Sequence, residues 1–150
     1  MFGNFELTES FIQFKDKVSS WEEAVVVSSE PLLKSGYVKQ SYIDAMLSCI
    51  KEYGPYVVIA PQLALPHARP ETGSVKVGFS ILKLKESVAF SESPDHQVKL
   101  LIALSCVDAE MHMKMLQGIV EVLSDEEKFQ GILEAETASE VLALFVGSSI

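Results

Sequence analysis

Residues 98–107 are apolar at almost every position, and this run constrains the fold more than any other part of the chain. A strand with one face in water alternates apolar and polar side chains, whereas a strand covered on both faces is apolar nearly throughout. We therefore expect a central strand here, in a sheet that is covered on both sides. At 150 residues the chain is long enough to bury a core of that kind.

Helical patterns stand on both sides of the strand patterns in the sequence. Capping boxes at residues 20–23 (Ser-Trp-Glu-Glu) and 137–140 (Thr-Ala-Ser-Glu) predict two helix starts. Ser41 and Asp125 begin two further helical patterns. Pro31 lies inside the first of these helices, where its missing N–H predicts a kink or a break.

Strand patterns fill the middle of the chain. The β-branched run 56–59 and the short apolar run 63–65 predict two strands, and residues 75–81 alternate with the period of a half-buried strand. This order of helices, strands and helices predicts an α/β fold. We expect residues 1–150 to form a single domain, a mixed β-sheet with helices packed on both faces.

The stretch from residue 60 to residue 71 carries side chains suited to chemistry. Its apolar run stops at Pro66, which cannot donate to a sheet ladder and fixes its own φ, and the next side chain is His67. Arg69 and Glu71 follow at the same strand end. An imidazole on a backbone stiffened by proline is a candidate site residue; the alternative interpretation is a polar turn after a buried strand.

A second histidine follows the central strand. Asp108 is placed to cap a helix in which His112, Met115, Ile119 and other apolar residues recur at helical spacing. His112 would then lie on the first turn, beyond a strand end, where ligand crevices form in open α/β sheets. The alternative is a core histidine that is satisfied by a carbonyl.

Charge and composition exclude several classes of function. The net charge of −9 argues against nucleic acid and against an anionic membrane surface, and it suits a protein partner with a basic face. No apolar run approaches the roughly 20 residues of a membrane span. Residues 1–9 lack the basic start and apolar core of a signal peptide. We therefore expect a cytoplasmic protein.

The remaining candidate residues favour no metal or cofactor. No carboxylate cluster with metal-ligand spacing occurs in the sequence, and His96 stands in a polar loop, where we expect it to be exposed. Cys49 and Cys106 lie in apolar contexts. We expect two buried free thiols of a reducing compartment, away from the histidines.

The histidine stretch resembles a known active-site segment. The string Leu-Pro-His-Ala-Arg-Pro-Glu at residues 65–71, preceded by Ile-Ala-Pro at residues 59–61, is similar to that of enzyme IIA components of the bacterial sugar phosphotransferase system. The match is to the mannitol/fructose type, most closely its ascorbate branch, and His112 extends it. The family usually has glycine where this chain has Gln62. Mannitol-like members have an arginine before the strand that corresponds to residues 56–59. The end of the preceding helix here has Lys51 and Glu52 instead, so this chain has no matching residue for that arginine.

The resemblance implies a phosphocarrier enzyme, a phosphotransferase. His67 would accept a phosphoryl group from the phosphohistidine of the carrier protein HPr, and His112 would face it across the site. Arg69 would either bind the phosphoryl oxygens or pair with Glu71. The acceptor would be a cognate IIB component, with a IIC permease served indirectly, for uptake of a sugar or of ascorbate. A regulatory phosphoprotein of the same fold is the alternative, and a homo-oligomer is left open.

Overall fold

The computed structural model describes residue 2, residues 5–107 and residues 109–146. In this part of the chain the strands form a sheet of order β1-β4-β5-β3-β2. Pairs β1–β4 and β3–β5 are parallel, whereas β2–β3 and β4–β5 are antiparallel, so the sheet is mixed, as predicted. The strands are β1 (Ile12–Lys15), β2 (Val58–Ala60), β3 (Gln62–Ala64), β4 (Gly78–Ala89) and β5 (Gln97–Ser105).

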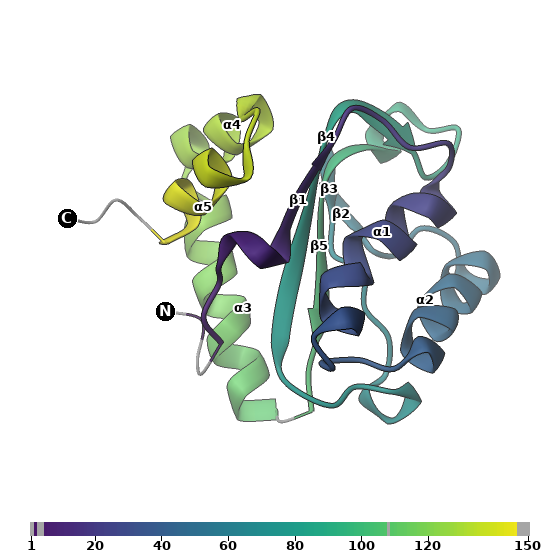
Figure 1. Cartoon of the computed structure of the whole chain (residues 1–150). Coiled ribbons are helices and arrows are strands. Elements are labelled where there is room, and N and C mark those ends of the chain that lie inside the picture. The colour runs from purple at the N-terminus through teal and green to yellow at the C-terminus, as the bar shows by residue number, and fades with distance from the viewer. Residues whose placement is uncertain (1, 3–4, 108, 147–150) are drawn as a thin grey trace.

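Helices cover both faces of this sheet (Figure 1). Helices α1 (Trp21–Lys34) and α2 (Gln40–Tyr53) lie on one face. Helices α3 (Ala109–Leu123), α4 (Glu126–Glu134) and α5 (Ala138–Val146) lie on the other. Short 3₁₀ turns occur at Glu9–Phe11, Pro70–Thr72 and Pro94–His96. The predicted α/β fold with helices on both faces is confirmed.

Predicted capping residues begin several helices. The Ser20 hydroxyl accepts a hydrogen bond from the Glu23 N–H at 3.2 Å, and the Asp125 carboxylate accepts one from the Lys128 N–H at 3.1 Å. The Ser19 N–H donates to the Glu23 carboxylate at 2.6 Å, and this bond lowers the pKa of Glu23. These side chains satisfy backbone N–H groups that the first helical turn leaves without partners.

Of the kink or break expected at Pro31, the break does not occur, because α1 runs on to Lys34. A proline cannot donate to the carbonyl four residues before it, here that of Val27. The Gln13 side chain of β1 donates to this carbonyl instead, at 2.5 Å. A side chain from the sheet therefore replaces the missing helical hydrogen bond.

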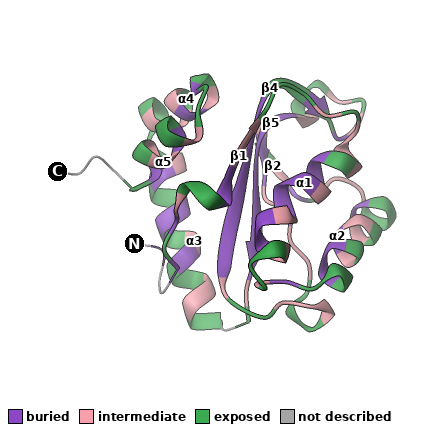
Figure 2. Cartoon of the chain, viewed as in Figure 1, coloured by how far each residue is buried: buried purple, intermediate pink, exposed green. Residues whose placement is uncertain are grey.

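Strand β4 is buried on both faces from Gly78 to Leu84, so the expectation of a half-buried strand here was wrong. Its polar positions find partners inside the protein: the Ser80 hydroxyl donates to the Ser28 carbonyl, and the Lys83 ammonium donates to the Leu84 carbonyl at 2.8 Å. Strand β5 is apolar and buried over most of its length, as predicted, and Figure 2 shows the buried centre of the sheet between the helix layers.

Gln62 has a backbone φ of 71° and is the one non-glycine residue with positive φ in the described part of the chain. Its strand register shifts at this point relative to β5, as in a β-bulge. The Gln62 side-chain oxygen is also buried with no hydrogen-bond partner among the described residues. The position therefore suits glycine, which adopts this conformation without a steric cost.

Replacing Gln62 with glycine is expected to raise the free energy of unfolding by about 1 kcal/mol, because it relieves the left-handed backbone. Urea denaturation of the wild type and variant measures the change. Gln130→Gly in α4 is the control, and there we expect a loss of about 1 kcal/mol, since glycine weakens a helix interior. Equal losses at both positions would contradict the prediction.

Candidate functional site

Both predicted histidines follow neighbouring parallel strands at the same edge of the sheet. His67 comes three residues after the end of β3, and His112 lies on the first turn of α3, which follows β5. The Leu104 N–H of β5 donates to the Pro66 carbonyl at 2.9 Å and ties the His67 turn to this edge. Asp108, the expected helix cap, lies outside the described residues.

The His67 ring is half-buried and is held at one nitrogen. Its Nδ1 lies 2.6 Å from the Leu65 carbonyl oxygen. Because a carbonyl only accepts hydrogen bonds, the neutral ring must carry its proton on Nδ1, which leaves the lone pair on Nε2. The Tyr56 ring meets the imidazole edge-on, with centroids 5.4 Å apart and planes at 88°. The structure thus fixes one tautomer and one orientation of His67.

Two tyrosine hydroxyls bond to the peptide unit that follows His67. Tyr56 donates its hydroxyl to the His67 carbonyl at 2.7 Å, and the Ala68 N–H donates to the Tyr42 hydroxyl at 3.1 Å. Tyr42 in turn donates to the Leu104 carbonyl of β5 at 2.6 Å. Sequence reasoning missed both tyrosines; the available signal was a tyrosine on the buried face of a helix, whose hydroxyl requires an internal partner.

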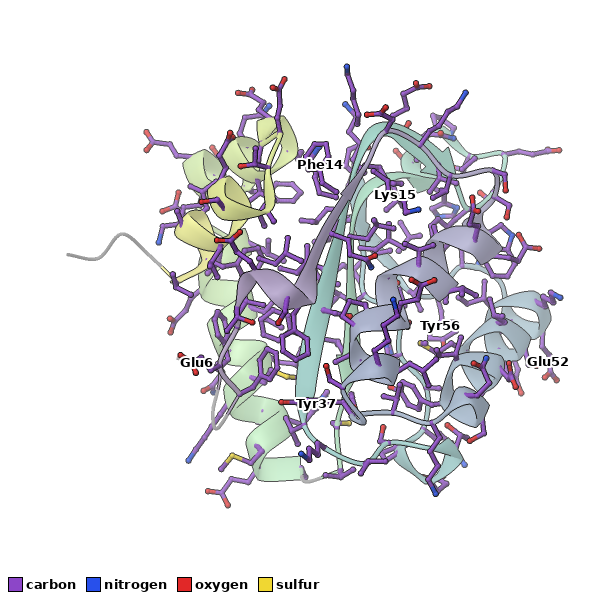
Figure 3. The ribbon with its side chains drawn as sticks, viewed as in Figure 1. Glu6, Phe14, Lys15, Tyr37, Glu52 and Tyr56 are labelled. Atoms are coloured by element: carbon purple, nitrogen blue, oxygen red, sulfur yellow. The ribbon has the colours of Figure 1, made fainter. Side chains whose placement is uncertain are left out.

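Both hydroxyls remain protonated near neutral pH. Burial raises the pKa of Tyr56 to about 12, and it also raises the pKa of Tyr42. Tyr42 is 1% exposed and Tyr56 39% exposed. Figure 3 shows Tyr56 on the side of the sheet that α1 and α2 cover. Each tyrosine can therefore act as a hydrogen-bond donor throughout the pH range in which an imidazole is neutral.

His112 is half-buried on the first turn of α3, which follows β5. Burial lowers its pKa, and repulsion from His67 lowers the pKa further. The His112 Nδ1 is buried and has no hydrogen-bond partner among the described residues. The helix places Met115 and Ile119 in the core, as the spacing predicted, but Val120 is 57% exposed.

Arg69 and Glu71 form an exposed ion pair, with Arg69 Nη1 3.7 Å from Glu71 Oε1. An exposed pair of this kind contributes about 0–1 kcal/mol, so the guanidinium can leave it at little cost. Lys51 and Glu52 are exposed on the last turn of α2, and Figure 3 shows Glu52 pointing outward.

His96 and the two cysteines differ from the sequence-based expectation. His96 is half-buried rather than exposed, and its Nδ1 lies 2.6 Å from the Ser91 hydroxyl, because the loop folds into a 3₁₀ turn. Cys49 and Cys106 are free but only half-buried. Cys49 contributes, after burial, to the raised pKa of Tyr56, whose ring contacts His67.

The chemistry that this edge supports is nucleophilic attack by an imidazole on an electron-poor group. His67 Nε2 carries the lone pair, and His112, at the same sheet edge, is a second ring that can donate one N–H when neutral. Within the described residues, no three His, Cys, Asp or Glu side chains are grouped so that they could hold a metal ion. None of the described helices has the length and apolar character needed to cross a membrane.

Known proteins are similar to this chain in sequence and in fold. The family model "Phosphoenolpyruvate-dependent sugar phosphotransferase system, EIIA 2" matches residues 6–147. The ascorbate-specific EIIA component of Escherichia coli K12 is 37% identical over 134 residues, which cover 89% of this chain and 87% of that protein.

Solved structures give the same result. The mannitol-specific cryptic enzyme IIA of Escherichia coli has a TM-score of 0.86 at 35% identity, covering 93% of this chain and 94% of that one. Enzyme IIA of the Escherichia coli mannitol system, solved in complex with phosphorylated enzyme IIB, has a TM-score of 0.82 at 28% identity, covering 95% and 98%.

Proposed function

The chain belongs to the EIIA 2 family of the phosphoenolpyruvate-dependent sugar phosphotransferase system, and on that premise we propose that it takes a phosphoryl group from phospho-HPr on His67 and passes it to a IIB component. EIIA components are phosphotransferases that carry a phosphoryl group. The proposal adds to family membership the donor, the acceptor and the residue that holds the group between them.

The observation that carries the proposal is the 2.6 Å contact between His67 Nδ1 and the Leu65 carbonyl. Phosphoryl transfer between nitrogen atoms requires a neutral imidazole in a single tautomer, and hydrogen-bond donors around the three equatorial oxygens. The contact supplies the first requirement. His67 Nε2 attacks the phosphorus of phospho-HPr as the P–N bond to the donor histidine breaks. In a second transfer an acceptor side chain of IIB attacks the phosphorus as the P–N bond to His67 breaks.

His112 and Arg69 supply the second requirement. With its buried Nδ1 unpaired, His112 is most stable when its proton is on Nε2, because the buried atom then carries only a lone pair. The Nε2–H is then free to donate to a phosphoryl oxygen. Arg69 exchanges Glu71 for the phosphoryl group, to which its guanidinium donates as a fork.

The relatives support a proposal for the transported compound. The 37% identity to ascorbate-specific components favours an ascorbate-like substrate over a regulatory role. We place the protein in the cytoplasm, where HPr and a IIB component reach it and a IIC permease is served indirectly. The net charge of −9 suits partners with basic docking faces.

Incubation with phosphoenolpyruvate, enzyme I and HPr is expected to add one phosphoryl group to His67. Tandem mass spectrometry locates the residue, and ¹⁵N-histidine NMR distinguishes Nε2 from Nδ1. A reaction without HPr is the control and should leave the protein unmodified. Adding a cognate IIB component should remove the group. Modification of another residue, or none, would overturn the proposal.

A further inference from the structure

The peptide unit between His67 and Ala68 is bound from two opposite sides. In a trans peptide the C=O and N–H point in opposite directions. Tyr56 donates to the carbonyl at 2.7 Å, and Tyr42 accepts from the N–H at 3.1 Å. The two tyrosines come from different elements, Tyr42 from α2 and Tyr56 from the segment that leads into β2. We call these two hydroxyls the tyrosine clamp.

The hydrogen bonds of the clamp run in one direction. The Tyr56 hydroxyl donates to the peptide carbonyl, the peptide N–H donates to the Tyr42 oxygen, and the Tyr42 hydroxyl donates to the Leu104 carbonyl at 2.6 Å. Hydrogen bonds aligned in this way polarise and strengthen one another in a low dielectric. This series of hydrogen bonds ends at the Leu104 carbonyl of β5, so it connects the His67 peptide to the central strand of the sheet.

The clamp fixes the direction of the His67 ring, which the contact between Nδ1 and the Leu65 carbonyl alone does not determine. The Leu65 carbonyl sets the tautomer of His67, but the ring direction also depends on the backbone to which the ring is attached. The Pro66 carbonyl is held by the Leu104 N–H at 2.9 Å, and the clamp holds the next peptide. Holding a reacting atom in its attacking geometry lowers the barrier to group transfer.

We propose that Tyr42 and Tyr56 are positioning residues for phosphoryl transfer, which orient the His67 imidazole by clamping the His67–Ala68 peptide. This inference rests on the proposed function of His67 as the phosphoryl acceptor. Neither hydroxyl is assigned contact with the phosphoryl group. Their effect on the reaction passes through the backbone of His67.

The test uses phenylalanine variants of the whole chain, since phenylalanine keeps the ring and removes only the hydroxyl. Tyr42→Phe, Tyr56→Phe and the double variant are compared with Tyr37→Phe as the matched control. The Tyr37 ring packs on Phe5 and Phe11, with centroids 5.8 and 5.5 Å apart, and it lies apart from Tyr56 in Figure 3. Transfer from phospho-HPr is followed at increasing donor concentration, and thermal unfolding is recorded for each protein.

Each clamp variant is expected to lose about tenfold in the transfer rate at saturating phospho-HPr, the loss that corresponds to about one hydrogen bond. Tyr42→Phe should leave KM unchanged, because Tyr42 is 1% exposed and cannot touch a partner. The double variant should also lose about tenfold rather than a hundredfold, because either deletion already frees the same peptide. Tyr37→Phe should transfer at the wild-type rate.

A spectroscopic readout separates positioning from stability. In ¹⁵N-histidine spectra at pH 8, unphosphorylated wild-type protein should show His67 as the Nδ1–H tautomer. The clamp variants should show a larger share of the Nε2–H tautomer, because a ring that turns with a freed backbone loses part of its contact with the Leu65 carbonyl. Unchanged rates and an unchanged tautomer in folded Tyr56→Phe would overturn the proposal, even if Tyr42→Phe fails to fold. Fully multiplicative losses in the double variant would also contradict a shared clamp.

Failure of the proposed function and failure of the clamp proposal give different experimental results. If the wild type acquires no phosphoryl group on His67, the proposed function fails, whereas the tautomer spectra still decide whether the clamp orients the ring. If the wild type is phosphorylated on His67 but the clamp variants match it in both rate and tautomer, only the clamp fails.

Discussion

His67→Ala is expected to lower the rate of phosphoryl acceptance from phospho-HPr by at least about 10⁴-fold, as loss of the catalytic nucleophile does in a serine protease. The variant lacks the Nε2 lone pair that the Leu65 contact leaves available. His112 cannot take its place, because the lone pair of His112 is on Nδ1, and this nitrogen is buried and inaccessible to phospho-HPr. Radiolabelled phosphoenolpyruvate with enzyme I and HPr measures the rate.

The fold should survive this substitution. His67 is half-buried, and the variant loses one hydrogen bond and one edge-on ring contact, a cost of about 1–2 kcal/mol. Circular dichroism and thermal unfolding check this. His96→Ala is the matched control, since His96 bonds to Ser91 in a separate loop, and we expect it to accept phosphate at the wild-type rate. A His67→Ala protein that still accepts label would place the phosphoryl group elsewhere.

Local sequence signals predicted those parts of the fold whose causes are local. The Ser20 and Asp125 caps depend on residues three positions apart, and the burial of β5 is visible in its own composition. The both-sided burial of β4 is not visible in its sequence. Ser80 looks like a solvent-facing residue until the Ser28 carbonyl from α1 meets it, 52 residues away along the chain.

The site also combines residues that a local sequence pattern predicts with residues that only distant contacts place. His67 and His112 follow strands that a one-dimensional pattern identifies, so their placement at one sheet edge was predictable. Tyr42 was not, because its two partners lie 26 and 62 residues away and both are backbone atoms. A backbone carbonyl or N–H exists at every position, so no residue type in the sequence marks such a partner.

His112 is expected to affect stability in a pH-dependent way. Its pKa in the folded protein is lowered from 6.5, mainly by burial, so below that value the unfolded chain binds more protons than the folded protein. The contribution of His112 to stability is therefore present above the unfolded pKa and is lost as the pH falls. His112→Ala should flatten the decline in stability between about pH 7 and pH 5.

The second large effect is the loss of transfer in His112→Ala. Removing one donor to the charge that develops on a reacting group typically costs about 10²–10³ in rate, and we expect a loss in that range. The fold should remain intact, because the ring is half-buried on the first turn of α3 and leaves a small cavity there. His112→Gln should lose less, because its amide can donate from a similar reach. Wild-type rates in both folded variants would show that His112 is a core residue without a part in transfer.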